Sequence, residues 1–70
     1  MKIVKFDEVM EGDVINILSG TETLSFELYF KNETIVKLRC EDLKNGDVSR
    51  VTMTKKEFDE GGFTRQRRHR

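Results

Sequence analysis

Few side chains of this sequence belong to the types that catalyse reactions or bind metals. Cys40 is the one cysteine and His69 the one histidine. Cys40 occupies an apolar-face position of an expected strand and is interpreted as a small buried hydrophobe, because a reactive thiol needs an exposed, electropositive setting. His69 stands next to the C-terminus, where nothing would hold it in a reactive geometry. One cysteine and one histidine cannot make a structural zinc centre, so neither residue predicts catalysis or a metal site.

Seven of the thirteen acidic residues form two groups, and neither group has the spacing of a catalytic or metal-binding motif. The group near the N-terminus lacks the Asp-x-Asp-x-Asp-Gly spacing of a calcium loop. The second group lies on a short exposed helix, away from any groove suited to acid–base catalysis. Together they predict a negative patch that would attract a basic partner protein. The residues of this candidate protein-binding surface are Asp7, Glu8, Glu11, Asp13, Glu57, Asp59 and Glu60.

The C-terminal stretch "EGGFTRQRRHR" carries the strongest binding signal. Residues 65–70 hold four arginines and no acid, whereas residues 1–64 hold nine basic and thirteen acidic residues, or 9 − 13 = −4. Arginine donates two hydrogen bonds to phosphate at once and also stacks on bases. An aromatic side chain on the polar face of a strand could add a stacking platform for a single strand. The candidate nucleic-acid-binding residues are Arg65, Arg67, Arg68, Arg70 and Tyr29.

Three interpretations of this charge distribution fit the sequence. The first is weak, largely sequence-independent binding of RNA or single-stranded DNA, since no recognition helix is available for a major groove. The second is a small regulator or inhibitor, such as an accessory protein of a phage or mobile element, that docks on a larger protein through its acidic body. The third is a solvated tail that folds back loosely on that body through exposed ion pairs.

The size of the chain argues against an enzyme. Seventy residues make one domain, with no second lobe to enclose a deep cleft. We therefore expect no catalysis, no cofactor and no small-molecule substrate, and a monomer or homodimer. A single cysteine allows no intramolecular disulfide, which favours the cytoplasm. The sequence shows no signal peptide and no apolar run of about 20 residues, so we expect no membrane-spanning segment.

Hydrophobic periodicity predicts the strands that would carry these residues. Apolar and polar residues alternate strictly over residues 24–30. This alternation places four apolar residues on one face: Leu24, Phe26, Leu28 and Phe30. Residues 34–40 alternate in the same way, and Asn45-Gly46, a pair typical of a type I′ hairpin turn, leads into residues 47–54. Residues 24–54 are thus predicted to form a three-stranded antiparallel meander.

Less regular patterns predict the remaining elements. Residues 2–6 and 13–18 are expected to be strands, separated by one helical turn that Asp7 caps and Gly12 closes. Thr54 and Glu57 have the spacing of a capping box, with Met53 and Phe58 at the positions of a hydrophobic staple, so a short helix should follow and stop at residues 61–62.

The predicted fold is mainly β. It is a small five-stranded antiparallel barrel or strongly bent sheet, SH3-like or OB-like, with one short C-terminal helical turn. The alternative is an open sheet with the helix packed across one face. Residues 1–63 would form the domain, and residues 64–70 a basic, flexible tail.

Overall fold

Five strands form one antiparallel sheet in the computed structural model, which describes residues 2–42 and 46–66. The order across the sheet is β4-β3-β2-β1-β5, so four consecutive strands form a meander and the last strand returns to pair with the first. The predicted meander over residues 24–54 is confirmed. The strands are β1 (Val14–Ser19), β2 (Glu22–Lys31), β3 (Ile35–Asp42), β4 (Asp47–Thr54) and β5 (Thr64–Gln66).

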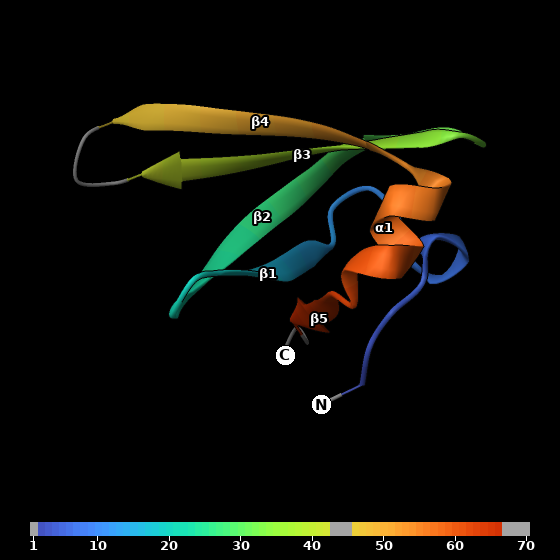
Figure 1. The fold of residues 1–70 in the computed structure, drawn as a ribbon. Helices are drawn as coiled ribbons and strands as arrows, with labels where there is room; N and C mark the ends of the chain where they lie inside the picture. The colour runs from blue at the N-terminus through green and yellow to red at the C-terminus, as the bar shows by residue number, and fades with distance from the viewer. Residues whose placement is uncertain (1, 43–45, 67–70) are drawn as a thin grey trace, which may run out of the picture.

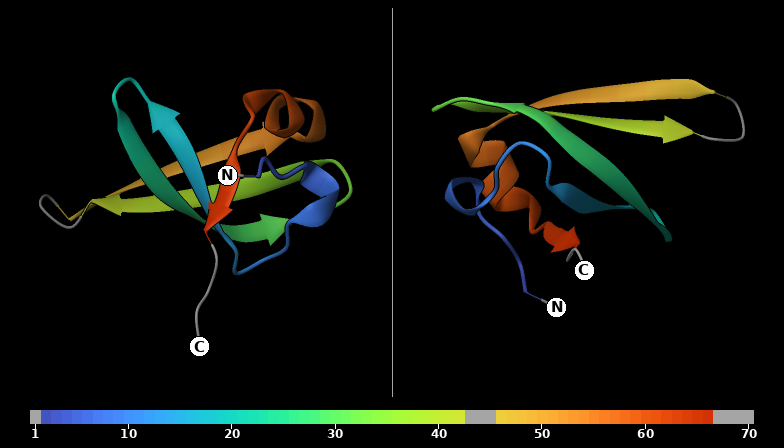
Figure 2. Two further views of the ribbon diagram at one scale, coloured as in Figure 1. Left: turned by 90° about the horizontal axis from the view of Figure 1, so that it is seen from below. Right: turned by 180° about the vertical axis from the view of Figure 1, so that it is seen from behind.

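The sheet is bent but open, as Figure 1 shows. Among the described residues, β4 pairs only with β3, and β5 pairs with β1 and with Ile3. The predicted closure into a barrel is therefore not observed. The sheet arches over the N-terminal segment and the helix α1 (Lys55–Gly61), which both lie on its inner face (Figures 1 and 2). No element within residues 2–42 and 46–66 covers the opposite face of the sheet, here called the outer face.

A hydrophobic core fills the space between the inner face and these covering segments. Alternation along β3 directs Val36 and Leu38 inward, where both are fully buried, and Cys40 packs partly buried beside them. Burying each large aliphatic or aromatic side chain contributes roughly 1.5–3 kcal/mol. The fully or nearly fully buried residues of the core are Val4, Phe6, Val9, Ile15, Phe26, Leu28, Val36, Leu38 and Phe58.

The helix α1 forms as the capping box predicts. The Thr54 side chain accepts a hydrogen bond from Glu57 N at 3.2 Å, and the Glu57 carboxylate accepts one from Thr54 N at 2.9 Å. Gly62 ends the helix in the left-handed conformation, with φ of 65°. Phe58 is the buried anchor, and its ring makes edge contacts with Phe6 and Phe63, at centroid distances of 6.5 and 5.3 Å.

The N-terminal segment differs from the prediction of a strand over residues 2–6. Only Ile3 makes an isolated bridge, to Thr64, and Val4 N donates to Phe63 O at 2.9 Å. The following turn is a 3-10 helix, η1 (Phe6–Glu8), in which Asp7 lies inside the turn and does not cap it. The capping carboxylate belongs to Glu8 and accepts from Lys5 N at 2.9 Å.

The register at the end of the β3–β4 hairpin differs from that of a two-residue turn at Asn45-Gly46. Such a turn would place Lys44 opposite Asp47, whereas the described pairing places Asp42 opposite Asp47. Gly46 has a φ of 72°, in keeping with a glycine at the turn. The predicted type I′ conformation involves residue 45, which lies outside the described residues.

β2 contains a β-bulge that changes which side chains face the core. The register shifts between Leu28, opposite Leu38, and Phe30, opposite Lys37, so Tyr29 is the extra residue. Phe30 consequently points to the outer face and is 38% exposed, and the prediction that it shares the apolar face of Leu28 is wrong. Lys31 turns inward instead, donates to Val9 O at 2.7 Å and covers the Phe6 ring.

Candidate nucleic-acid interface

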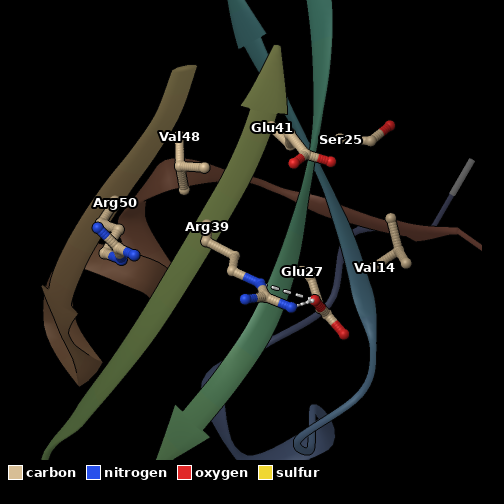
Figure 3. A pocket seen from close by; sticks show the side chains of 7 residues that line it. All are labelled: Val14, Ser25, Glu27, Arg39, Glu41, Val48 and Arg50. Carbon is tan, nitrogen blue, oxygen red and sulfur yellow. Dashed lines mark hydrogen bonds and ion pairs between the residues drawn. The ribbon is translucent and has the colours of Figure 1, made fainter. Parts of the chain in front are cut away.

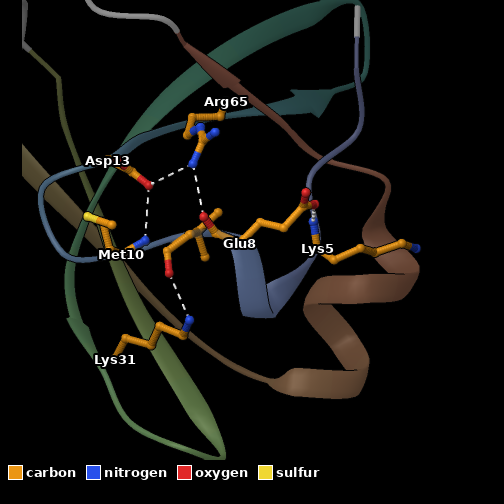
Figure 4. Close-up of polar contacts among 7 residues, drawn as sticks. Lys5, Glu8, Met10, Asp13, Lys31 and Arg65 are labelled. Carbon is orange, nitrogen blue, oxygen red and sulfur yellow. Dashed lines mark hydrogen bonds and ion pairs between the residues drawn. The ribbon is translucent and has the colours of Figure 1, made fainter.

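The basic C-terminal sequence begins inside the sheet. Residues 64–66 form β5, so the sheet extends three residues beyond the domain boundary drawn at residue 63. Arg65 lies opposite Ile15, and its guanidinium donates to Glu8 O at 3.0 Å and approaches the Asp13 carboxylate at 3.4 Å (Figure 4). Arg65 is thus held by its own chain. The other predicted tail residues, Arg67, Arg68 and Arg70, lie outside the described residues.

The last described residue, Gln66, belongs to a row of paired residues that crosses the outer face. Gln66 is opposite Val14 on β1, and Val14 is opposite Glu27 on β2. The same row continues through Arg39 on β3 to Arg50 on β4. The chain therefore leaves the sheet at the end of a row that crosses the outer face and ends in two arginines.

Basic side chains gather on this outer face from two neighbouring strands. Lys37 and Arg39 alternate with the buried residues of β3, and Arg50 lies directly opposite Arg39. The acids of the face are Glu27 and Glu41, so its formal charge is 3 − 2 = +1. The face is positive, whereas the chain before residue 65 is negative as a whole.

A hollow of about 310 Å³ lies in the middle of the outer face (Figure 3). The Arg39 guanidinium lines it, and its Nε and Nη2 atoms each lie 2.9 Å from Glu27 Oε1. Its lining residues come from β1 to β4 and are Val14, Ser25, Glu27, Arg39, Glu41, Val48 and Arg50.

Two charged residues of the hollow have no partner in the part of the chain that the structure describes. Neither Arg50 nor Glu41 makes an ion pair or a side-chain hydrogen bond there. Arg39 and Arg50 are like charges directly opposite each other, an arrangement that destabilises a sheet unless something compensates it. Glu27 compensates Arg39 alone, which leaves Arg50 available to a ligand.

Aromatic side chains extend the face beyond the hollow. Tyr29 and Phe30 are both 38% exposed, and the Lys37 ammonium lies 5.3 Å from the centre of the Phe30 ring. Tyr29, predicted as a stacking platform, thus lies next to a second aromatic residue that the alternation had assigned to the core. The bulge in β2 turns Phe30 to the outer face, and the sequence "LYFKN" contains no glycine that would signal a bulge.

The candidate protein-binding acids gather around the two helical turns. The Asp59 carboxylate accepts from Phe6 N at 2.7 Å, which joins α1 to η1, and Asp7 pairs with Lys55 at 3.3 Å. Four more of these carboxylates accept hydrogen bonds from backbone N–H groups of Lys5, Met10, Lys31 and Thr54; they belong to Glu8, Asp13, Glu11 and Glu57. Most of this acidic side therefore holds turns together, a role that the sequence indicates only for Glu57.

Neither a cluster of metal-binding side chains nor a membrane-spanning helix is found among residues 2–42 and 46–66. No three His, Cys, Asp or Glu side chains there come close enough to hold a metal ion. No helix in that part of the chain has the length and apolar character needed to cross a membrane. Comparisons of the chain with family models, with curated proteins and with solved structures gave no match. We therefore infer a function from the chemistry of the outer face.

Proposed function

We propose that this protein is a non-enzymatic module that binds single-stranded nucleic acid, RNA or DNA, on the outer face of its sheet. The observation that carries the proposal is the meeting of Lys37, Arg39 and Arg50 with Tyr29 and Phe30 on one uncovered face. These residues are scattered over three strands and share no motif in the sequence. The three arginines that follow Gln66 in the sequence would add contacts to phosphate.

The chemistry of the face suits a flexible strand better than a duplex. Cations attract the phosphate backbone, and exposed aromatic rings stack on unpaired bases. A sheet face offers no helix to enter a major groove, and Tyr29 and Phe30 can stack only on bases that are not already paired. Lys37, close to the Phe30 ring, would bring a positive charge next to a stacked base.

The direct test is a binding titration of labelled RNA and single-stranded DNA of about ten nucleotides, a length within the usual site sizes of such proteins. The double variant Lys37→Gln/Arg50→Gln removes two cations from the face. We expect it to bind at least about tenfold more weakly at low salt, because two charge-assisted contacts are lost.

A matched control removes the same charge elsewhere. Lys2→Gln/Lys56→Gln neutralises two exposed lysines away from the outer face, so it changes the net charge equally. We expect this control to keep most of the affinity. Equal weakening by both double variants would contradict a defined interface, and intact binding by the face variant would rule out the outer face.

We propose also that the bent sheet is of the SH3-like kind. Four hairpin-connected strands followed by a return of β5 beside β1 support this class, and a short helix bridges the return. The sheet has the strong bend that such small barrels use to protect their edges. Backbone contacts between β4 and β5 in an experimental structure would establish closure, and a flat β4 edge without them would exclude a barrel.

A protein partner on the acidic side is the second candidate function. The packing of η1 against α1 supports it, because this contact gathers carboxylates from residues 7–13 and 57–60. Asp7 and Glu60 are exposed and accept no backbone hydrogen bond among the described residues, so Asp7→Lys/Glu60→Lys changes the charge without breaking a turn. Loss of a captured partner with this variant, but not with Lys37→Gln/Arg50→Gln, would favour the second candidate.

A further inference from the structure

The hollow on the outer face combines positive and negative side chains, and this combination does not favour the binding of a bare phosphate. Arg50 would attract a phosphate, but Glu41 lines the same hollow and would repel it. A neutral group that both donates and accepts hydrogen bonds satisfies both side chains. A nucleobase is such a group, and a nucleobase is what a single strand would bring to this face.

The register fixes the relative placement of the two unpartnered side chains. Glu41 lies opposite Val48, and Arg50 is two residues further along β4, so Glu41 and Arg50 are diagonal neighbours on one face. Diagonal neighbours lie about 7–8 Å apart, and long side chains can reach toward a group held between them. Figure 3 shows Arg50 on β4 across from Arg39, and Glu41 further along the same strand as Arg39.

The Arg39 guanidinium offers a flat surface in the hollow on which a base could lie. Two contacts from Glu27 hold the Arg39 guanidinium, and the planar guanidinium is a group on which bases stack. Val48, which is 41% exposed, and Val14 add apolar surface beside it. The hollow has a volume of about 310 Å³, at the small end of the range for ligand sites.

We propose that this hollow binds one guanine base. Guanine presents two acceptors, O6 and N7, to which arginine donates in pairs, and Arg50 supplies this donor. On its Watson–Crick edge guanine also presents two neighbouring donors, N1–H and the N2 amino group, which suit the Glu41 carboxylate. None of adenine, cytosine and uracil presents both of these paired sets. This inference rests on the proposed function, because the guanine belongs to the bound single strand. It adds a preference for guanine to the binding of single strands.

The test uses an oligo-uridine strand of about ten nucleotides with one central guanosine, compared with strands carrying adenosine, inosine or 7-deazaguanosine at that position. We expect the guanosine strand to bind about tenfold more tightly than the adenosine strand. Inosine, which lacks the N2 amino group, and 7-deazaguanosine, which lacks N7, should each lose part of this advantage.

The decisive variant is Glu41→Gln, because its two effects have opposite signs. Removing a negative charge should leave binding of the plain oligo-uridine strand unchanged or slightly stronger, while the preference for guanosine should fall by about tenfold. Glu33→Gln is the matched control, since Glu33 is exposed and lies in the loop between β2 and β3, outside the hollow. It should keep the preference.

The outcomes separate the hollow from the general function, and guanosine monophosphate serves as a further probe. Equal binding of all four strands would overturn the guanine site and leave the proposed function standing. Selective binding of free guanosine monophosphate, together with no binding of any of the strands, would support the hollow and overturn the proposed function. Absence of binding in every arm would overturn both.

Discussion

At the scale of the residue, Asp59 links two segments that are far apart in the sequence. Its carboxylate accepts the Phe6 N–H, which is partly buried, at 2.7 Å. We predict that Asp59→Ala lowers the free energy of unfolding by about 1–3 kcal/mol, because it leaves that donor without a partner. Chemical denaturation measures the loss. Glu60→Ala, one residue away and exposed, should change the stability by less than about 0.5 kcal/mol, and an equal loss there would contradict the role of Asp59.

Gly62 allows a second prediction at this scale. Its φ is 65°, and a Cβ built on it would meet only Ile3 Cδ1, at the ordinary distance of 3.8 Å. Gly62→Ala should therefore destabilise through the backbone alone, by about 1–2 kcal/mol. Gly62→Asn should be less destabilising, because asparagine tolerates the left-handed conformation. A thermal melt that showed no difference between the two variants would contradict this explanation.

At the scale of the element, the bulge in β2 implies that Leu28 and Phe30 contribute differently to stability, whereas simple alternation would place both in the core. Leu28 is fully buried, whereas Phe30 is 38% exposed on the outer face. We expect Leu28→Ala to lower the stability by about 2–5 kcal/mol and Phe30→Ala to lower it by much less. Equal losses in urea denaturation would mean that Phe30 belongs to the core. The same Phe30→Ala variant should weaken nucleic-acid binding, because it removes a stacking ring.

The elements that the sequence predicts well are those whose signals are local. Alternation in β3 and the Thr54–Glu57 capping box each depend on neighbouring residues, and both are confirmed. The bulge and β5 could not be predicted in this way. Thr64–Gln66 is too short to show a period, and it forms a strand only because β1 offers an unpaired edge.

The candidate site was less predictable than the fold. Tyr29 and the arginines were accessible from the sequence as residue types, but the meeting of Lys37, Arg39 and Arg50 depends on the pairing of β3 with β4. The acidic group was visible as a cluster of charge. Glu8, Asp13 and Glu57 accept from backbone N–H groups three residues earlier in the sequence. Glu11 accepts from Lys31 N and Asp59 from Phe6 N, and these contacts between distant segments have no local signal in the sequence.

At the scale of the whole molecule, we expect both the outer face of the sheet and the arginines that follow β5 in the sequence to contribute to binding. A variant that ends at Gln66 keeps β5 and removes three arginines. We predict that it still binds single strands, with a salt dependence shallower by up to about 2 in the slope of log K against log salt, since each neutralised phosphate contributes about 0.7. Complete loss of binding at low salt would mean that the face has no affinity of its own.

The most direct test of the central claim is an NMR titration of the full chain with a guanosine-containing single strand, following the valine methyl groups and the arginine Nε–H signals. Val14 and Val48 line the outer face, whereas Val36 lies in the core. Nucleic-acid binding on the outer face predicts shifts of the Val14 and Val48 methyl groups and of the Arg39 and Arg50 Nε–H groups, with Val36 unchanged. Shifts confined to residues 67–70, or to the acidic turns, would contradict it.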